Sequence, residues 1–198
     1  PGLSRHSFTA HMAMHMSVVA IACPLLAQGI ARGPFDPLRG NASGWLGAVF
    51  SPYVASALEF MVVWAWHSPG LHHLARHSDA WLVVEQGSFL AVGMLVWLSA
   101  LGGSAFARER AAAGVGGLLM TSMHMTLLGV LLALASRPLY GHGAAPTAFG
   151  LSPLQDQHLG GVVMLAAGGI SYLVGALALL AALLVDRSPA LADEPADE

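Results

Sequence analysis

The chain has 198 residues, of which 56% are hydrophobic and 10% are charged, and its formal net charge is −3 at pH 7. Soluble globular domains carry roughly 25% charged residues. This composition therefore excludes an ordinary soluble domain and indicates an integral membrane protein that is surrounded by a lipid bilayer. We expect no nucleic-acid partner for a chain of this charge.

Five apolar runs are long enough to cross a hydrocarbon core of about 30 Å at about 1.5 Å per helical residue. They are Phe8–Ile30, Trp45–Trp66, Ala80–Leu101, Gly114–Ala135 and Gly160–Val185. Backbone groups in lipid must be paired within their own segment, so we predict an all-α fold, a polytopic transmembrane helical bundle over residues 1–187. Residues 188–198 are acidic and without periodicity, which indicates a disordered tail. The chain begins at Pro1 without a methionine, and we interpret it as a processed or shortened product.

Arginine sets the orientation, because the chain contains no lysine. Three arginines fall on the side of the amino terminus: Arg5, Arg76 and Arg137. Five fall on the opposite side: Arg32, Arg39, Arg108, Arg110 and Arg187. Since cytoplasmic loops carry the excess of positive charge, we predict an extracytoplasmic amino terminus and a cytoplasmic carboxyl-terminal tail. Nine of the ten histidines then lie at or beyond the extracytoplasmic face, and His124 lies mid-membrane.

The first span contains the motif His-Met-Ala-Met-His-Met at residues 11–16. His11 and His15 are four residues apart and share a helix face, and Met12 and Met16 share a neighbouring face. Imidazole binds copper in either oxidation state, and thioether sulfur favours Cu(I). The motif predicts a copper site, with Cu(I) favoured. The alternative is that the methionines pack between helices and the histidines make ordinary hydrogen bonds.

The second span ends where His67 stands between Trp66 and a helix-ending proline two residues later. We predict His67 as a metal ligand, because it is level with the outer part of the first helix. The loop that follows carries His72, His73 and His77. His73 and His77 would share a face if this loop were helical, and we predict them as groups through which an ion gains access. The alternative for all three loop histidines is that they are simply solvated.

Ionisable side chains also occur inside the predicted spans. His124 lies deep in the fourth span beside Met123, and we predict both as ligands; neighbouring hydroxyl side chains could instead satisfy a buried imidazole. Glu85 lies about one turn inside the outer face, and we predict that it supports the ligands. Glu59 is deeper, and both a supporting or proton-carrying role and a structural hydrogen bond remain open for it.

The segment before the fifth span places Asp156 and His158 next to the start of its helix. We predict both as supporting or access groups, and Asp156 could instead cap the helix. Gly160 and Gly161 would allow a neighbouring helix to approach closely. The single cysteine, Cys23, excludes an internal disulfide, and we interpret it as a packed residue or a soft ligand.

Together these residues resemble the CtaG-type cytochrome c oxidase assembly factors, a family of integral membrane proteins associated with copper handling. The similar motifs, in order, are the histidines at 11 and 15, Trp-His-x-Pro at 66–69, Glu-x-x-x-Phe at 85–89 with a later tryptophan at 97, Arg-Pro-Leu-Tyr at 137–140 and Asp-Gln-x-Leu-Gly-Gly-x-x-Met at 156–164. Gln86 departs from the pattern, since the family is expected to have a histidine there. The resemblance implies a copper chaperone rather than an enzyme, in the inner (plasma) membrane of a bacterium. It implies a cytochrome c oxidase subunit or another copper chaperone as partner, and a homo-oligomer is compatible with it.

We therefore expect copper to bind on the extracytoplasmic side, between the first, second and fourth helices, before transfer to the oxidase. The predicted ligands are His11, His15, His67, His124, Met12, Met16 and Met123. The predicted supporting or access groups are Glu85, Asp156, His158, His73 and His77. Two alternatives remain: a b-type haem protein with histidines as axial ligands, and a structural subunit of a respiratory complex whose histidines only make hydrogen bonds.

Overall fold

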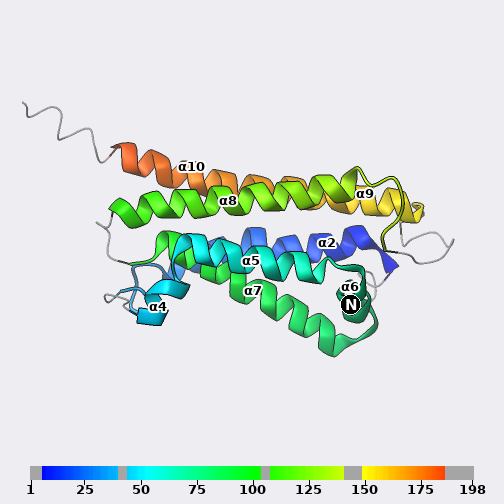
Figure 1. The fold of residues 1–198 in the computed structure, drawn as a ribbon, viewed down its shortest axis with the longest axis horizontal. Helices are drawn as coiled ribbons and strands as arrows, with labels where there is room; N and C mark the ends of the chain where they lie inside the picture. The colour runs from blue at the N-terminus through cyan, green and yellow to red at the C-terminus, as the bar shows by residue number, and fades with distance from the viewer. Residues whose placement is uncertain (1–5, 40–43, 104–107, 141–148, 186–198) are drawn as a thin grey trace, which may run out of the picture.

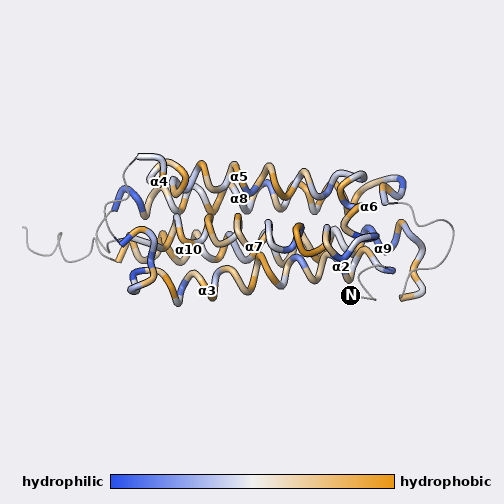
Figure 2. Tube along the Cα trace, turned by 90° about the horizontal axis from the view of Figure 1, so that it is seen from below, coloured by the Kyte–Doolittle hydropathy of each residue, from blue (hydrophilic) through white to orange (hydrophobic). Residues whose placement is uncertain are grey.

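The computed structural model describes residues 6–39, 44–103, 108–140 and 149–185, and all of the regular structure in these ranges is helical. The long helices run side by side along one axis (Figure 1). Hydrophobic residues occupy most of their length, and hydrophilic residues gather mainly towards the two ends of the bundle (Figure 2). The elements in chain order are α2 (Phe8–Met16), the π-helical η1 (Ser17–Ala22), α3 (Cys23–Ile30), α4 (Gly44–Val49), α5 (Pro52–Trp66), α6 (Pro69–His77), α7 (Asp79–Leu101), α8 (Arg108–Ala133), α9 (Pro153–Met164), the π-helical η2 (Leu165–Gly169) and α10 (Ile170–Val185).

Four helices of the described residues are long and apolar enough to cross a membrane, which confirms the predicted fold class. They are Phe8–Ile30, Asp79–Leu101, Arg108–Ala133 and Pro153–Val185. The first has the predicted bounds. The helix at the third predicted span begins at Asp79, one residue earlier than predicted. The two later spans also begin earlier than predicted, at Arg108 and Pro153. The predicted tail at 188–198 lies outside the described residues.

The second predicted span, Trp45–Trp66, is not one continuous helix. It is divided into α4 and α5, because Pro52 lacks a backbone N–H and restricts Ser51 to an extended conformation with ψ 127°. Helix α5 has 15 residues and is about 22 Å long, which is shorter than a hydrocarbon core of about 30 Å. Its length is the reason that four spans are found where five were expected.

The ends of several helices meet at one end of the bundle, where α2, α7 and α9 begin and α5 and α8 end, with α6 across them (Figure 1). Serine side chains cap the three helices that begin there: Ser7 accepts from Ala10 N, Ser78 from Trp81 N and Ser152 from Gln155 N. Proline at the first turn of α6 starts a helix in what was predicted as a loop. This end of the bundle therefore brings together side chains from segments far apart in sequence.

Glycines allow the close packing that the sequence predicts around Gly160 and Gly161. A Cβ at Gly161 would lie 2.5 Å from the Ala133 nitrogen of α8, and one at Gly160 would lie 2.4 Å from the Phe8 ring of α2. A Cβ at Gly129 of α8 would lie 2.8 Å from the Leu165 backbone nitrogen. The helix made of α9, η2 and α10 therefore packs directly on α8 and α2.

Candidate metal centre

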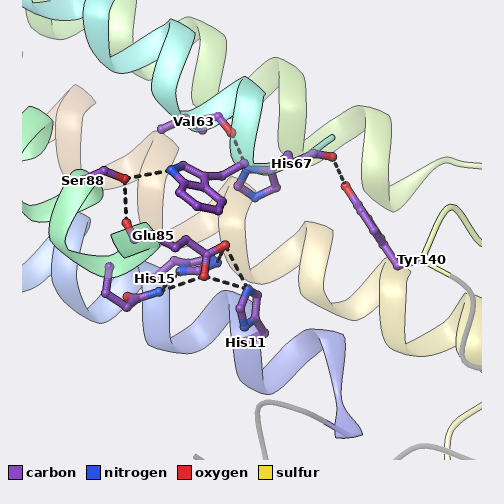
Figure 3. A network of polar contacts seen from close by, with 9 residues as sticks. His11, His15, Val63, His67, Glu85, Ser88 and Tyr140 are labelled. Carbon is purple, nitrogen blue, oxygen red and sulfur yellow. Dashed lines mark hydrogen bonds and ion pairs between the residues drawn. The ribbon is translucent and has the colours of Figure 1, made fainter. Parts of the chain in front are cut away.

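Glu85 of α7 lies near His11 and His15 of α2 and near His67, which directly follows α5 (Figure 3). Both of its carboxylate oxygens lie 3.3 Å from His11 Nε2, and one lies 3.6 Å from His15 Nε2. The side chains of Glu85, His11 and His15 are each 0–1% exposed. A carboxylate removed from water is costly unless a cation or hydrogen bonds compensate its charge. The site therefore favours a positive charge beside Glu85.

His72 completes a group of three ligand atoms that could hold a metal ion. One atom each from His11, His72 and Glu85 lie within 4.8 Å of one another. His72 is 2% exposed, and its ring centroid lies 4.8 Å from that of His11. The sequence analysis did not choose His72, because the segment was interpreted as a loop. The spacing of His72, Ala75 and Arg76, which places them on one buried face of α6, could have identified it.

Gln86 holds the ring of His15 in place. The two side chains meet at 2.6 Å between the Gln86 amide and His15 Nδ1, so Nε2 is the nitrogen that faces Glu85. If the Gln86 amide is rotated by 180°, its oxygen accepts a hydrogen bond from His15 Nδ1–H. His15 Nε2 then carries a lone pair that can bind a metal. Gln86, where the resemblance led us to expect a histidine, therefore orients a neighbouring histidine.

His67 has a fixed tautomer because its Nδ1 lies 2.7 Å from the Val63 carbonyl oxygen, which can only accept a hydrogen bond (Figure 3). Its Nε2 must then carry the lone pair, and this buried atom has no hydrogen-bond partner among the described residues. The Tyr140 hydroxyl donates to the His67 carbonyl oxygen at 2.7 Å and fixes the backbone. The His67 ring lies 6.0 Å from that of His15, centroid to centroid. A neutral imidazole held in this way is ready to bind a metal.

The other predicted ligands lie elsewhere. His124 is buried on α8, where its ring contacts Phe60 of α5, seven residues and so about 10 Å along the helix from His67. Met123 is 67% exposed on the outside of the bundle. Met12 and Met16 are buried on the side of α2 that faces α9 and η2, where they lie next to Gly160 and Gly168. The described contacts bring none of these four side chains into the group around Glu85.

Asp156 and His158 have structural contacts in the described residues. Asp156 accepts hydrogen bonds from Ser7 Oγ at 2.8 Å, from Phe8 N at 2.6 Å and from Thr9 N at 3.2 Å, so it holds the beginning of α2. His158 Nε2 lies 2.8 Å from the Ala135 carbonyl oxygen, at the end of α8.

Helix α6 has one buried and one exposed face. Arg76 is buried, and this burial lowers the pKa of its guanidinium to about 10, although the charge of Asp156 acts in the opposite direction. His73 and His77 are exposed, with their rings stacked at 4.0 Å, which confirms the predicted pair on a helix. Since His72 belongs to the same short helix, α6 connects the buried cluster with the surface.

The sequence model of the cytochrome c oxidase caa3 assembly factor family matches residues 2–185. No curated protein and no solved structure matches the chain. The match covers every helix described above and all of the residues around Glu85.

Proposed function

Since the chain belongs to the cytochrome c oxidase caa3 assembly factor family, we propose that it binds copper at the cluster around Glu85 and passes the ion on during oxidase maturation. Copper is cargo in this proposal, and the chain is a carrier rather than an enzyme. The proposed recipient is a subunit of the oxidase or another copper chaperone.

The close approach of His11, His72 and Glu85, with ligand atoms within 4.8 Å of one another, is the observation that carries this proposal. Three ligands leave positions open, which suits an ion that must be released again. His15 and His67 stand beside these three and supply further imidazoles. A bound cation would also compensate the buried charge of Glu85.

The donor atoms are nitrogen and oxygen, which changes the preference for Cu(I) that followed from the methionine motif. Imidazole suits copper in either state and also zinc, iron and nickel. We propose copper because cytochrome c oxidase requires it, and at this cluster the donor set accommodates Cu(II) as well as Cu(I). The side chains of Met12 and Met16 lie on a different face of α2, where they contact α9 and η2.

The site opens to the extracytoplasmic side in this proposal, as the arginine distribution predicts. The exposed pair His73 and His77 on α6 is the proposed first contact for an arriving ion, which His72 on the same helix then delivers to Glu85.

Metal analysis of the purified full chain after Cu(II) loading and desalting tests the proposal. We expect stoichiometric copper in the wild type and its loss in a His11→Ala/His72→Ala variant. A His73→Ala/His77→Ala variant removes the same number of imidazoles from the exposed face and should retain copper at equilibrium. Glu85→Gln keeps the side-chain shape but removes the charge, and it should bind copper at least tenfold more weakly, because even loss of a carboxylate that only supports a ligand typically costs that much.

Three results would contradict the proposal. Equal copper in both double variants would mean that binding is non-specific. A haem spectrum in the purified wild type would favour the b-type haem alternative, and absence of any metal would favour the structural-subunit alternative. In cells, the His11→Ala/His72→Ala variant should lower the copper content of the oxidase, whereas the control variant should not.

A further inference from the structure

Four buried methionines come from α2 and from the helices beside it, and the two on α2 lie on the face next to the one that carries His11 and His15. Met12 and Met16 come from α2, Met125 from α8 and Met164 from α9. Their exposed fractions are 0%, 4%, 0% and 0%, so all four are interior side chains. The function proposed above does not use them.

Helices α2 and α9 run in the same direction and meet along their length, and α8 runs in the opposite direction beside α9. Asp156 binds the beginning of α2, a Cβ at Gly160 would lie 3.2 Å from Met12 Cγ, and Ser171 Oγ donates to the Ala20 carbonyl oxygen. A Cβ at Gly168 would lie 3.4 Å from Met16 Sδ and 3.5 Å from Met125 Cβ. Met16 and Met125 therefore flank one point on η2.

Met164 belongs to the same layer. It is four residues after Gly160 and four before Gly168, and both of those glycines face α2. Residues four apart share a helix face. The Phe8 ring and Met12 fill the space beside Gly160, and Met16 and Met125 fill the space beside Gly168.

Two π-helical segments begin at this layer. Segment η1 starts directly after Met16, and η2 starts directly after Met164; the two segments are in contact with each other. Such segments are rare and occur frequently at functional sites, because they turn side chains and backbone groups away from their regular helical positions. Core packing alone does not require both π-helical segments to begin directly after a methionine.

We propose that Met12, Met16, Met125 and Met164 form a second metal site, for a soft monovalent cation such as Cu(I) or Ag(I). Thioether sulfur is a soft and uncharged ligand, so the site favours Cu(I) over divalent ions. Alternate residues of α2 serve the two sites: His11 and His15 face Glu85, and their neighbours Met12 and Met16 face α9. The chain thus holds a nitrogen–oxygen site and a sulfur site on two adjacent faces of one helix.

X-ray absorption at the copper edge of the Cu(I)-loaded full chain tests this site, because sulfur neighbours can be distinguished from nitrogen and oxygen. We expect sulfur neighbours in the wild type and in the His11→Ala/His72→Ala variant. They should be lost in Met16→Leu/Met125→Leu, which nearly keeps the volume of both side chains, so that the fold is retained. The matched control is Met61→Leu/Met123→Leu, since those two methionines are 55% and 67% exposed.

The proposal is overturned if Cu(I) in the wild type has only nitrogen and oxygen neighbours, a result that needs no variant to fold. It is also overturned if Met16→Leu/Met125→Leu retains the sulfur signal. The sulfur signal of Cu(I) does not depend on Cu(II) binding at Glu85, because the His11→Ala/His72→Ala variant tests the Glu85 cluster separately. Ag(I) titration of the same samples excludes an effect of copper oxidation.

Discussion

Asp156 shows how one side chain can connect segments that are distant in sequence. Its helix, α9, is capped by Ser152 and Gln155, so the carboxylate of Asp156 is available to another helix. It accepts from the first backbone N–H groups of α2, where the helix dipole favours a negative charge. The result is that the first residues of α2, and with them His11, are held at a fixed distance from α9.

Asp36 has the equivalent role at the other end of the bundle and gives the protein a predicted acid sensitivity. Burial alone would raise the pKa of Asp36, but hydrogen bonds from the backbone N–H groups of Gly103, Leu38 and Arg32 lower it below its ordinary value, with a further contribution from Arg110. Since the folded pKa is depressed, its stabilisation is complete above the unfolded value of about 3.9. That stabilisation is lost as the pH falls through the folded pKa.

We therefore expect the thermal unfolding midpoint of the wild type in detergent to fall more steeply below about pH 4 than that of Asp36→Asn. At neutral pH the variant should be less stable by about 1–3 kcal/mol, the usual contribution of hydrogen bonds to a charged group. Parallel curves for the two proteins in acid would show that Asp36 does not carry this dependence.

Among the helices, α5 and α6 show how proline determines element boundaries. Pro52 starts α5 inside a run that is apolar enough to be interpreted as one span, and Pro69 starts α6 inside a predicted loop. The shorter α5 ends at His67, and α6 then turns across the end of the bundle. Both features place histidines beside Glu85.

The contact of α8 with α9 gives a prediction at this scale. In Gly161→Ala the new Cβ would lie 2.5 Å from a backbone nitrogen of α8, so the two helices must separate, and we expect a loss of about 1–3 kcal/mol. Gly87→Ala is the matched control, because nothing lies within 4 Å of its Cβ position on α7. Alanine there should stabilise the helix by up to about 1 kcal/mol. Unfolding midpoints measured in one detergent check both; a neutral Gly161→Ala would show that the helices can adjust freely.

At the level of the whole molecule, the two ends of the bundle differ in chemistry. One end holds the histidine cluster and α6, and the other holds the Asp36 loop and the beginning of α8 (Figure 1). In the proposed function this polarity matters, because an ion bound at the cluster end would have access from one compartment.

Cysteine labelling tests the predicted orientation of this bundle. In a Cys23→Ala background we expect a membrane-impermeant maleimide to label His73→Cys in intact cells, because His73 is exposed at the cluster end. Phe35→Cys, at a position that is 85% exposed at the other end, should react only after the membrane is broken. The reverse pattern would place the cluster on the cytoplasmic side. Native Cys23 is fully buried, so its removal serves only to exclude background.

The sequence by itself determined the helical membrane fold and much of the cluster. Length and hydropathy identify spans because lipid offers no partner to an unpaired backbone group. Spacing placed His11 and His15 on one face, and the Trp-His-x-Pro context identified His67. Glu85, about one turn inside the outer face, was predicted to support these side chains.

Only the tertiary structure decided which side chains meet. It brought His72 to Glu85 and placed His124 beside Phe60, which is seven residues, or about 10 Å, along α5 from His67. It also turned Met12 and Met16 towards α9. Periodicity tells which residues share a face of one helix, but not which neighbour that face contacts. That choice depends on where prolines end helices and where glycines let them approach, and these contacts form only when all of the helices pack together.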